Sequence, residues 1–170
     1  VNIKQAIRLF FSNPSLDMVF IEAIANSLDA NASKINICIS IEELGKQETL
    51  KISVQDNGIG FTEERYAKFC KLLQVEDSTH KGVGRLVYLY YFDTIEVSSI
   101  FDKQHRSFLY NTSFDENNSN MVLEPIAQQE QRTILHFSNC TLKRLSSYSS
   151  ILPDALKRMI LEEFLPRFYV

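Results

Sequence analysis

The spacing of hydrophobic residues divides the chain into segments of two kinds. A repeat of three to four residues predicts helices, because it places apolar side chains on one helical face. The segments with this repeat are residues 2–11, 14–31, 62–73, 85–92 and 153–165. Alternation of apolar and polar residues predicts strands instead. The alternating segments lie at residues 34–41, 50–56, 95–97, 108–110 and 134–137.

Two of these elements carry signals that predict their limits or their orientation. Asn13 is a favoured N-cap residue and Pro14 suits the first helical position, so we expect a helix to start there. In the strand after Lys34, isoleucines occupy every second position from Ile35 to Ile41. This alternation predicts that the isoleucines lie on the buried face of the sheet.

The order of the elements indicates the fold class. The first two strands are separated by a polar turn at residues 42–49 and predict a hairpin, and the later strands predict an antiparallel meander. Helices interleaved with hairpins favour a two-layer α/β (α+β) sandwich, with a mixed, mostly antiparallel sheet covered by helices on one face. Because 170 residues are enough for one well-buried core, we expect a single domain over residues 1–170.

Composition limits the classes of function. Apolar residues make up 45% and charged residues 23% of the chain, and its apolar runs are too short to span a bilayer, so no membrane role is expected. The net charge of -3, without a basic block, does not indicate nucleic-acid binding. Cys38, Cys70 and Cys140 predict free thiols in a reducing compartment, so we expect a cytoplasmic protein. The chain begins at Val1 and not at Met, which suggests a trimmed native start.

The segment at residues 20–29 places polar side chains on an otherwise apolar helix. Glu22, Asn26 and Asp29 follow the spacing i, i+4 and i+7, which at about 100° per residue keeps them within an arc of roughly 60°. A carboxylate enclosed by apolar surface needs partners to offset its desolvation, and a metal ion, a water or a ligand would serve. The alternative is an amphipathic helix whose polar side faces solvent.

A second polar group follows the strand that ends at Asp56. A carboxylate there, beside Gly58 and Gly60, can accept a hydrogen bond from the exocyclic amine of adenine, and the glycines let a flat ring approach the backbone. Guanine presents an acceptor at that position and is expected to be rejected. The alternative is a hairpin turn of the Asp-Asn-Gly type.

A third group opens the helix predicted at residues 85–92. Gly82, Val83 and Gly84 offer successive backbone N–H groups at a helix start, where a phosphate can dock. Lys81 and Arg85 flank this loop and could reach phosphate oxygens, although a plain helix-entry loop with solvated charges has the same sequence. The preceding polar segment at residues 74–81 has the character of a lid.

These motifs together resemble a known family. The order of a helix with E-x-x-x-N-x-x-D-A, a D-x-G-x-G turn and a G-x-G loop is similar to that of the GHKL ATPase superfamily, which contains the gyrase B subunit, the ninety-kilodalton heat-shock chaperone, histidine kinases and MutL. The resemblance spans about residues 16–137. It implies the Bergerat fold, with ATP held between the sheet and the helices.

The resemblance also implies roles for individual residues. Glu22 matches the general base of the hydrolytic members, and Asp56 matches the acid that binds adenine. Asn26 is expected to give one amide oxygen to Mg²⁺. Asp29 lies by the nucleotide pocket in the family, where it either supports the ligand or orients backbone groups. Thr133 matches a family threonine at the adenine, although Arg132 stands where glycine often precedes it.

The function implied is a slow Mg²⁺-dependent ATPase that binds ATP and ADP. Coupling elements lie in a following domain of the relatives, so the chain is expected to be an N-terminal fragment of a longer protein, with an ATP-dependent homodimer as one arrangement of the full-length protein. Two alternatives remain open. One is a nucleotide-gated interaction switch without significant turnover, and the other is a histidine or serine protein kinase of the superfamily.

Overall fold

The computed structural model describes residues 3–71, 84–115, 120–127, 130–141 and 148–168. The α-helices of this part are α1 (Ile3–Phe10), α2 (Asp17–Asp29), α3 (Glu63–Lys71), α4 (Leu86–Tyr91) and α5 (Pro153–Phe164). The strands are β1 (Ile35–Ile41), β2 (Leu50–Asp56), β3 (Phe92–Phe101), β4 (Gln104–Tyr110), β5 (Val122–Pro125) and β6 (Arg132–Cys140). Short 3-10 helices occupy Gln47–Thr49, Ser149–Ile151 and Leu165–Phe168.

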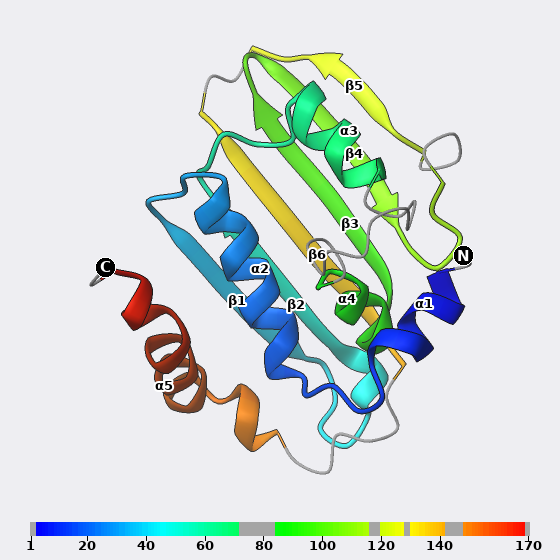
Figure 1. Ribbon diagram of the computed structural model, residues 1–170, viewed down its shortest axis with the longest axis vertical. Coiled ribbons are helices and arrows are strands. Elements are labelled where there is room, and N and C mark those ends of the chain that lie inside the picture. Colours follow the sequence, from blue (N-terminus) through cyan, green and yellow to red (C-terminus); the bar gives the residue numbers. More distant parts are fainter. Residues whose placement is uncertain (1–2, 72–83, 116–119, 128–129, 142–147, 169–170) are drawn as a thin grey trace.

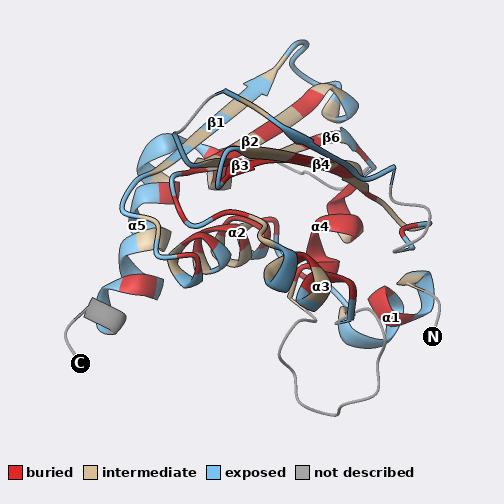
Figure 2. Ribbon diagram, turned by 90° about the horizontal axis from the view of Figure 1, so that it is seen from above, coloured by how far each residue is buried: buried red, intermediate tan, exposed pale blue. Residues whose placement is uncertain are grey.

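The strands form one sheet in the order β1-β2-β6-β3-β4-β5 (Figure 1). Every pair of neighbouring strands is antiparallel. The α-helices lie on one side of the sheet, and α5 lies beside the β1 edge (Figure 2). The expected two-layer α/β sandwich with helices on one face is therefore confirmed, but the sheet is antiparallel throughout and not mixed.

The later strands differ from the predicted meander in their order. β6 is inserted between β2 and β3 and pairs with both, so the last strand in sequence is central in the sheet. Spacing along the chain carries no information on this insertion, because it depends on long-range pairing. β5 was not predicted, because all of its residues are exposed and it shows no alternation of burial.

Two further predictions about local structure are corrected. Helix α2 begins at Asp17, not at Pro14, and no side chain caps its start. Pro14 is buried, and its carbonyl accepts a hydrogen bond from the Tyr91 hydroxyl, so a tertiary contact holds it outside the helix.

The isoleucines of β1 are only half-buried, because β1 is an edge strand, and Cys38 on its other face is exposed.

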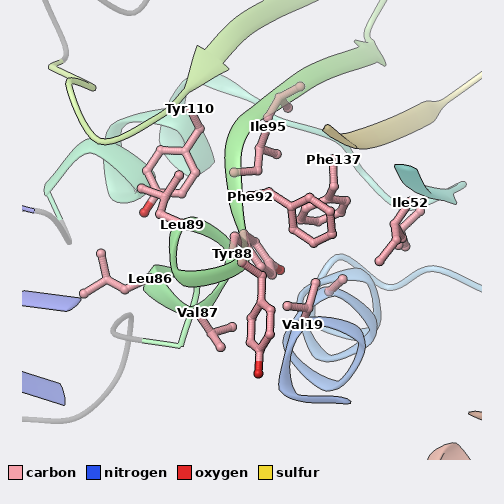
Figure 3. Packing of buried hydrophobic residues seen from close by; sticks show 14 of the residues in the cluster. Val19, Ile52, Leu86, Val87, Tyr88, Leu89, Phe92, Ile95, Tyr110 and Phe137 are labelled. Carbon is pink, nitrogen blue, oxygen red and sulfur yellow. The ribbon is translucent and has the colours of Figure 1, made fainter. Parts of the chain in front are cut away.

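The core lies between the sheet and the helices and is rich in aromatic rings (Figure 3). The ring of Tyr88 from α4 meets the ring of Phe137 from β6 edge-on, with centroids 5.0 Å apart. Val19 of α2 points toward the same cluster (Figure 3). These contacts bring α2 and α4 together over the central strands.

No helix among the described residues has the length and apolar character that a bilayer crossing needs.

A buried arginine ties the sheet to the turn after β2. Arg106 of β4 has no exposed surface, and its Nη1 donates to the Phe61 carbonyl at 2.6 Å while its Nη2 donates to Glu63. Its guanidinium also lies over the Tyr66 ring, 4.7 Å from the centroid. A buried charge of this kind is tolerated only while its partners remain in place.

We predict that Arg106→Met lowers the free energy of unfolding by about 1–3 kcal/mol, because it leaves the Phe61 carbonyl without its donor. Urea unfolding followed by circular dichroism measures this change. As a matched control, Glu63→Gln changes only the exposed partner, whose side chain is 75% exposed, and should cost within about 1 kcal/mol. Equal losses in the two variants would contradict a structural role for the buried guanidinium.

Candidate active site

Asp56 ends strand β2 with its carboxylate buried, and two donors satisfy it. Its Oδ1 accepts from the Gly58 backbone N–H at 2.8 Å, and its Oδ2 accepts from the Ser27 hydroxyl of α2 at 3.0 Å. The residue is 7% exposed. Because each carboxylate oxygen has two lone pairs, the group keeps acceptor capacity for a further donor.

The glycines after Asp56 lie where the chain passes close to neighbouring elements. A Cβ added at Gly58 would lie 2.6 Å from the Ala30 carbonyl oxygen at the end of α2. Gly60 has a φ of +79°, and a Cβ there would meet the Ser99 hydroxyl at 2.8 Å. The fold itself therefore requires both glycines, whatever they contribute to a ligand.

Thr133 lies beside Asp56, as the sequence predicted. The two residues are directly paired in the β2–β6 register. The Thr133 hydroxyl is 2.9 Å from the Ser99 hydroxyl, which in turn accepts from the Phe61 N–H at 2.8 Å. Arg132, where relatives often have glycine, belongs to strand β6 and does not prevent this placement.

Glu22 meets the segment that opens α4. An ideal Cβ at Gly84 would lie 2.0 Å from Glu22 Oε2, so the carboxylate rests against the Gly84 backbone and only glycine fits there without a shift of Glu22. Residues 62 positions apart in sequence are thus in contact. The structure therefore brings the E-x-x-x-N-x-x-D-A helix into contact with the G-x-G loop.

Asn26 lies one turn after Glu22 and is held by two acceptors. Its Nδ2 donates to Glu22 Oε1 at 3.1 Å and to the Tyr88 hydroxyl at 3.2 Å. Within the described part of the chain, no donor is bonded to its Oδ1. Magnesium prefers oxygen ligands and keeps several waters, which suits a single neutral amide oxygen.

Asp29 lies near the end of α2 with its side chain exposed. Its backbone carbonyl accepts from Arg65 Nη1 at 3.1 Å, so a guanidinium from α3 satisfies one of the last carbonyls of the helix. This contact does not involve the Asp29 side chain, so the choice between ligand support and orientation of backbone groups stays a prediction.

Arg85 does not extend toward solvent. It is 6% exposed, and its guanidinium lies over the Phe69 ring, 4.0 Å from the centroid. Its Nε and Nη2 are buried without a hydrogen-bond partner among the described residues. A contact between Arg85 and a phosphate would require the guanidinium to leave this ring.

Burial controls the electrostatics of the two carboxylates. It raises the pKa of Glu22, while the hydrogen bond from Asn26 and the charge of Arg85 act in the opposite direction and the charge of Asp29 raises it further. Burial likewise raises the pKa of Asp56, against the hydrogen bonds from Gly58 and Ser27. Both carboxylates are therefore stronger bases than exposed ones.

Most of the described predicted residues fall into two adjoining groups along α2, whereas Arg85 lies over the Phe69 ring and the Asp29 side chain is exposed. Glu22, Asn26 and Gly84 form one group, and Asp56 with Gly58 and Thr133 forms the other. Ser27 joins them, because it follows Asn26 on the helix and bonds Asp56. Lys81, Gly82 and Val83, with the predicted lid at residues 74–81, lie outside the described residues.

Sequence reasoning missed several polar side chains of the site. Ser27, Tyr88 and Ser99 each bond a predicted residue, and Arg65 bonds the end of α2. Ser27 could have been suspected, because it interrupts the buried face of an apolar helix. The others become neighbours only through the fold.

No cluster of three His, Cys, Asp or Glu residues that could hold a metal occurs in the described ranges.

Comparisons with known proteins show the family and the fold of the chain. A family model for "Histidine kinase-, DNA gyrase B-, and HSP90-like ATPase" matches residues 14–143. A solved structure described as the N-terminal domain of a DNA repair protein is similar with a TM-score of 0.56 and 17% identity. The similarity covers 98% of this chain and 44% of that one, and at this identity it shows the fold alone. A search of curated proteins found no match. The chain belongs to the family of histidine kinase-, DNA gyrase B- and HSP90-like ATPases, and this membership implies that it binds ATP.

Proposed function

We propose that this chain binds ATP with Mg²⁺ between α2, α4 and the end of β2, and that the full-length protein hydrolyses it slowly. The observation that carries the proposal is the contact of the Glu22 carboxylate with the Gly84 backbone, beside Asn26 on the same helix. A carboxylate, an amide oxygen and a glycine loop at one place are the groups that a terminal phosphate, its metal and its attacking water need.

Asp56 would select the base. Its spare lone pairs would accept from the exocyclic amine of adenine, and its two existing donors hold the carboxylate in position. The Thr133 hydroxyl, paired beside it, would support the same contact. A side chain at Gly58 would crowd this carboxylate, because its Cβ would lie 3.0 Å from Asp56 Oδ1.

Glu22 would act as the general base. Its raised pKa makes it a better proton acceptor than an exposed glutamate, and Asn26 fixes the orientation of its carboxylate. Bound Mg²⁺ would neutralise charge on the phosphates, with Asn26 as one ligand and with waters and phosphate oxygens as the others. Phosphate contacts from Lys81, Gly82 and Val83, and closure of the lid at residues 74–81 with dimerisation, belong to the proposal as predictions.

We predict that Glu22→Gln leaves the dissociation constant for ATP within about threefold and lowers turnover by about 10²–10⁴-fold, because glutamine keeps the shape but accepts no proton at neutral pH. Calorimetric titration gives the affinity and phosphate release gives the rate. Glu64→Gln, on the exposed side of α3, is the control and should change neither. Unchanged turnover in Glu22→Gln would remove the residue from this role and favour a switch without hydrolysis.

The rate should depend on pH through the same carboxylate. Because burial raises the pKa of Glu22 above 4.5, the base becomes protonated as the pH falls, and turnover should decline on the acid side at a pH higher than an exposed glutamate would give. The residual turnover of the Glu22→Gln variant should not show this decline at low pH. If the decline persists in the variant, another group is responsible for the titration.

Base selection gives a separate prediction. Asp56→Asn should weaken ATP binding by about 10–100-fold, because a hydrogen bond to a charged acceptor is lost, and should narrow the preference for ATP over GTP. Asp93→Asn, an exposed acid at the start of β3, is the control. Calorimetric titration with both nucleotides measures the change. Equal ATP affinity in wild type and Asp56→Asn would contradict the assignment.

A further inference from the structure

Arg85, which follows Gly84 and precedes α4, is a buried cation with incomplete hydrogen bonding. It is 6% exposed, and its Nε and Nη2 have no partner among the described residues. The Phe69 ring next to the guanidinium offsets part of the cost of burying the charge, but it does not replace the missing acceptors. Because nearly all buried polar groups in folded proteins are bonded, Arg85 destabilises the fold where it lies.

A second buried arginine shows what a guanidinium with a structural role looks like in this fold. Arg106 also lies over an aromatic ring, but its Nη1 donates to the Phe61 carbonyl and its Nη2 donates to Glu63. No hydrogen bond joins the Arg85 side chain to another described residue. The property of Arg85 that needs an explanation is therefore its charge.

Glu22 supplies the negative charge that Arg85 can attract. Among the described residues, the groups whose charge acts on Arg85 are one carboxylate, one thiol and two phenols, namely Glu22, Cys70, Tyr88 and Tyr110. Burial raises the pKa of both phenols, so they carry no charge near neutral pH. The single carboxylate in this group is that of the predicted base.

The two oxygens of the Glu22 carboxylate are held differently. Its Oε1 accepts from Asn26 Nδ2 at 3.1 Å. Its Oε2 lies against the Gly84 backbone, 2.0 Å from an ideal Cβ there, and no donor among the described residues is bonded to it. Packing against Gly84 limits this oxygen on one side, and the charge of Arg85, the next residue, attracts the carboxylate.

We propose that Arg85 is a positioning residue, whose charge holds Glu22 Oε2 at the start of α4 while Asn26 holds Oε1. This role rests on the proposed function, in which Glu22 is the general base. A base must keep one oxygen directed at the attacking water, so a carboxylate that is free to rotate would lose rate without losing nucleotide affinity. Arg85 would thus act on the chemical step without contacting phosphate.

The variant Arg85→Met separates positioning from phosphate binding. Methionine keeps an unbranched side chain beside Phe69 but removes the charge. We expect kcat to fall about tenfold while the Kd for ATP stays within about threefold of the wild-type value. Phosphate release and calorimetric titration measure the two quantities, and Arg158→Met, at an exposed position of α5, is the control that should change neither. A rise of about tenfold in Kd would indicate a phosphate contact and overturn the proposal.

A double-mutant cycle tests whether Arg85 acts through Glu22. When Glu22→Gln is already present, Arg85→Met should change the residual kcat less than about twofold, because the carboxylate on which the charge acts is gone. If the two separate losses multiply in the double variant, Arg85 acts independently of Glu22 and the proposal is wrong.

The same cycle distinguishes failure of this role from failure of the proposed function. Unchanged kcat in Glu22→Gln alone would reject the general base, and the positioning role with it. Unchanged kcat in Arg85→Met, beside a strongly reduced kcat in Glu22→Gln, would reject the positioning role alone.

Stability distinguishes positioning from a structural role. Because Arg85→Met removes a buried charge with unbonded donors, its midpoint of urea unfolding should equal or exceed that of the wild type. A structural role would lower the midpoint, as expected for Arg106→Met. A lower midpoint together with a lower kcat would attribute the loss of rate to damage to the fold and overturn the proposal.

Discussion

The hydrogen bond between the Ser27 hydroxyl and the buried Asp56 carboxylate is the interaction on which the site depends. It joins the last turn of α2 to the end of β2, where a carboxylate would otherwise be buried without partners at a cost of several kcal/mol. Because α2 is fixed at this point, Asn26 and Glu22 lie at set positions along the helix. The positions of the two groups of polar residues along α2 therefore depend on one helix-to-strand contact.

The second constraint is the approach of α4 to α2. The Tyr88 ring packs on Phe137 in the core, and its hydroxyl accepts from Asn26, so one side chain serves both packing and the site. The Glu22 carboxylate against the Gly84 backbone is the consequence. Burial that raises the pKa of Glu22 arises from the same packing, which links its basicity to the stability of the domain.

Sequence reasoning recovered the elements with strong periodicity, including α2, β1 and β2, and the two-layer class that they imply. Its motifs also include Glu22, Asn26 and Gly84, which lie together in the structure, while the roles of these residues stay predictions. It missed the insertion of β6 between β2 and β3, which rests on long-range pairing, and the start of α2, where Tyr91 holds Pro14.

Ser99 and Tyr88 were missed because their partners are distant in sequence. Burial of Arg85 over Phe69 was missed because an arginine beside a glycine loop suggests a ligand and not a core contact.

Replacement of Mg²⁺ by paramagnetic Mn²⁺ tests most directly whether one cleft holds the nucleotide in this direction. In NMR spectra of the chain with Mn²⁺ and ATP, the side-chain amide of Asn26 and the backbone amide of Gly84 should be broadened most. The amide of Gly58 should shift with ATP but broaden much less, because the base lies away from the metal. Strong broadening at Gly58, or broadening confined to residues outside α2, β2 and α4, would contradict the arrangement.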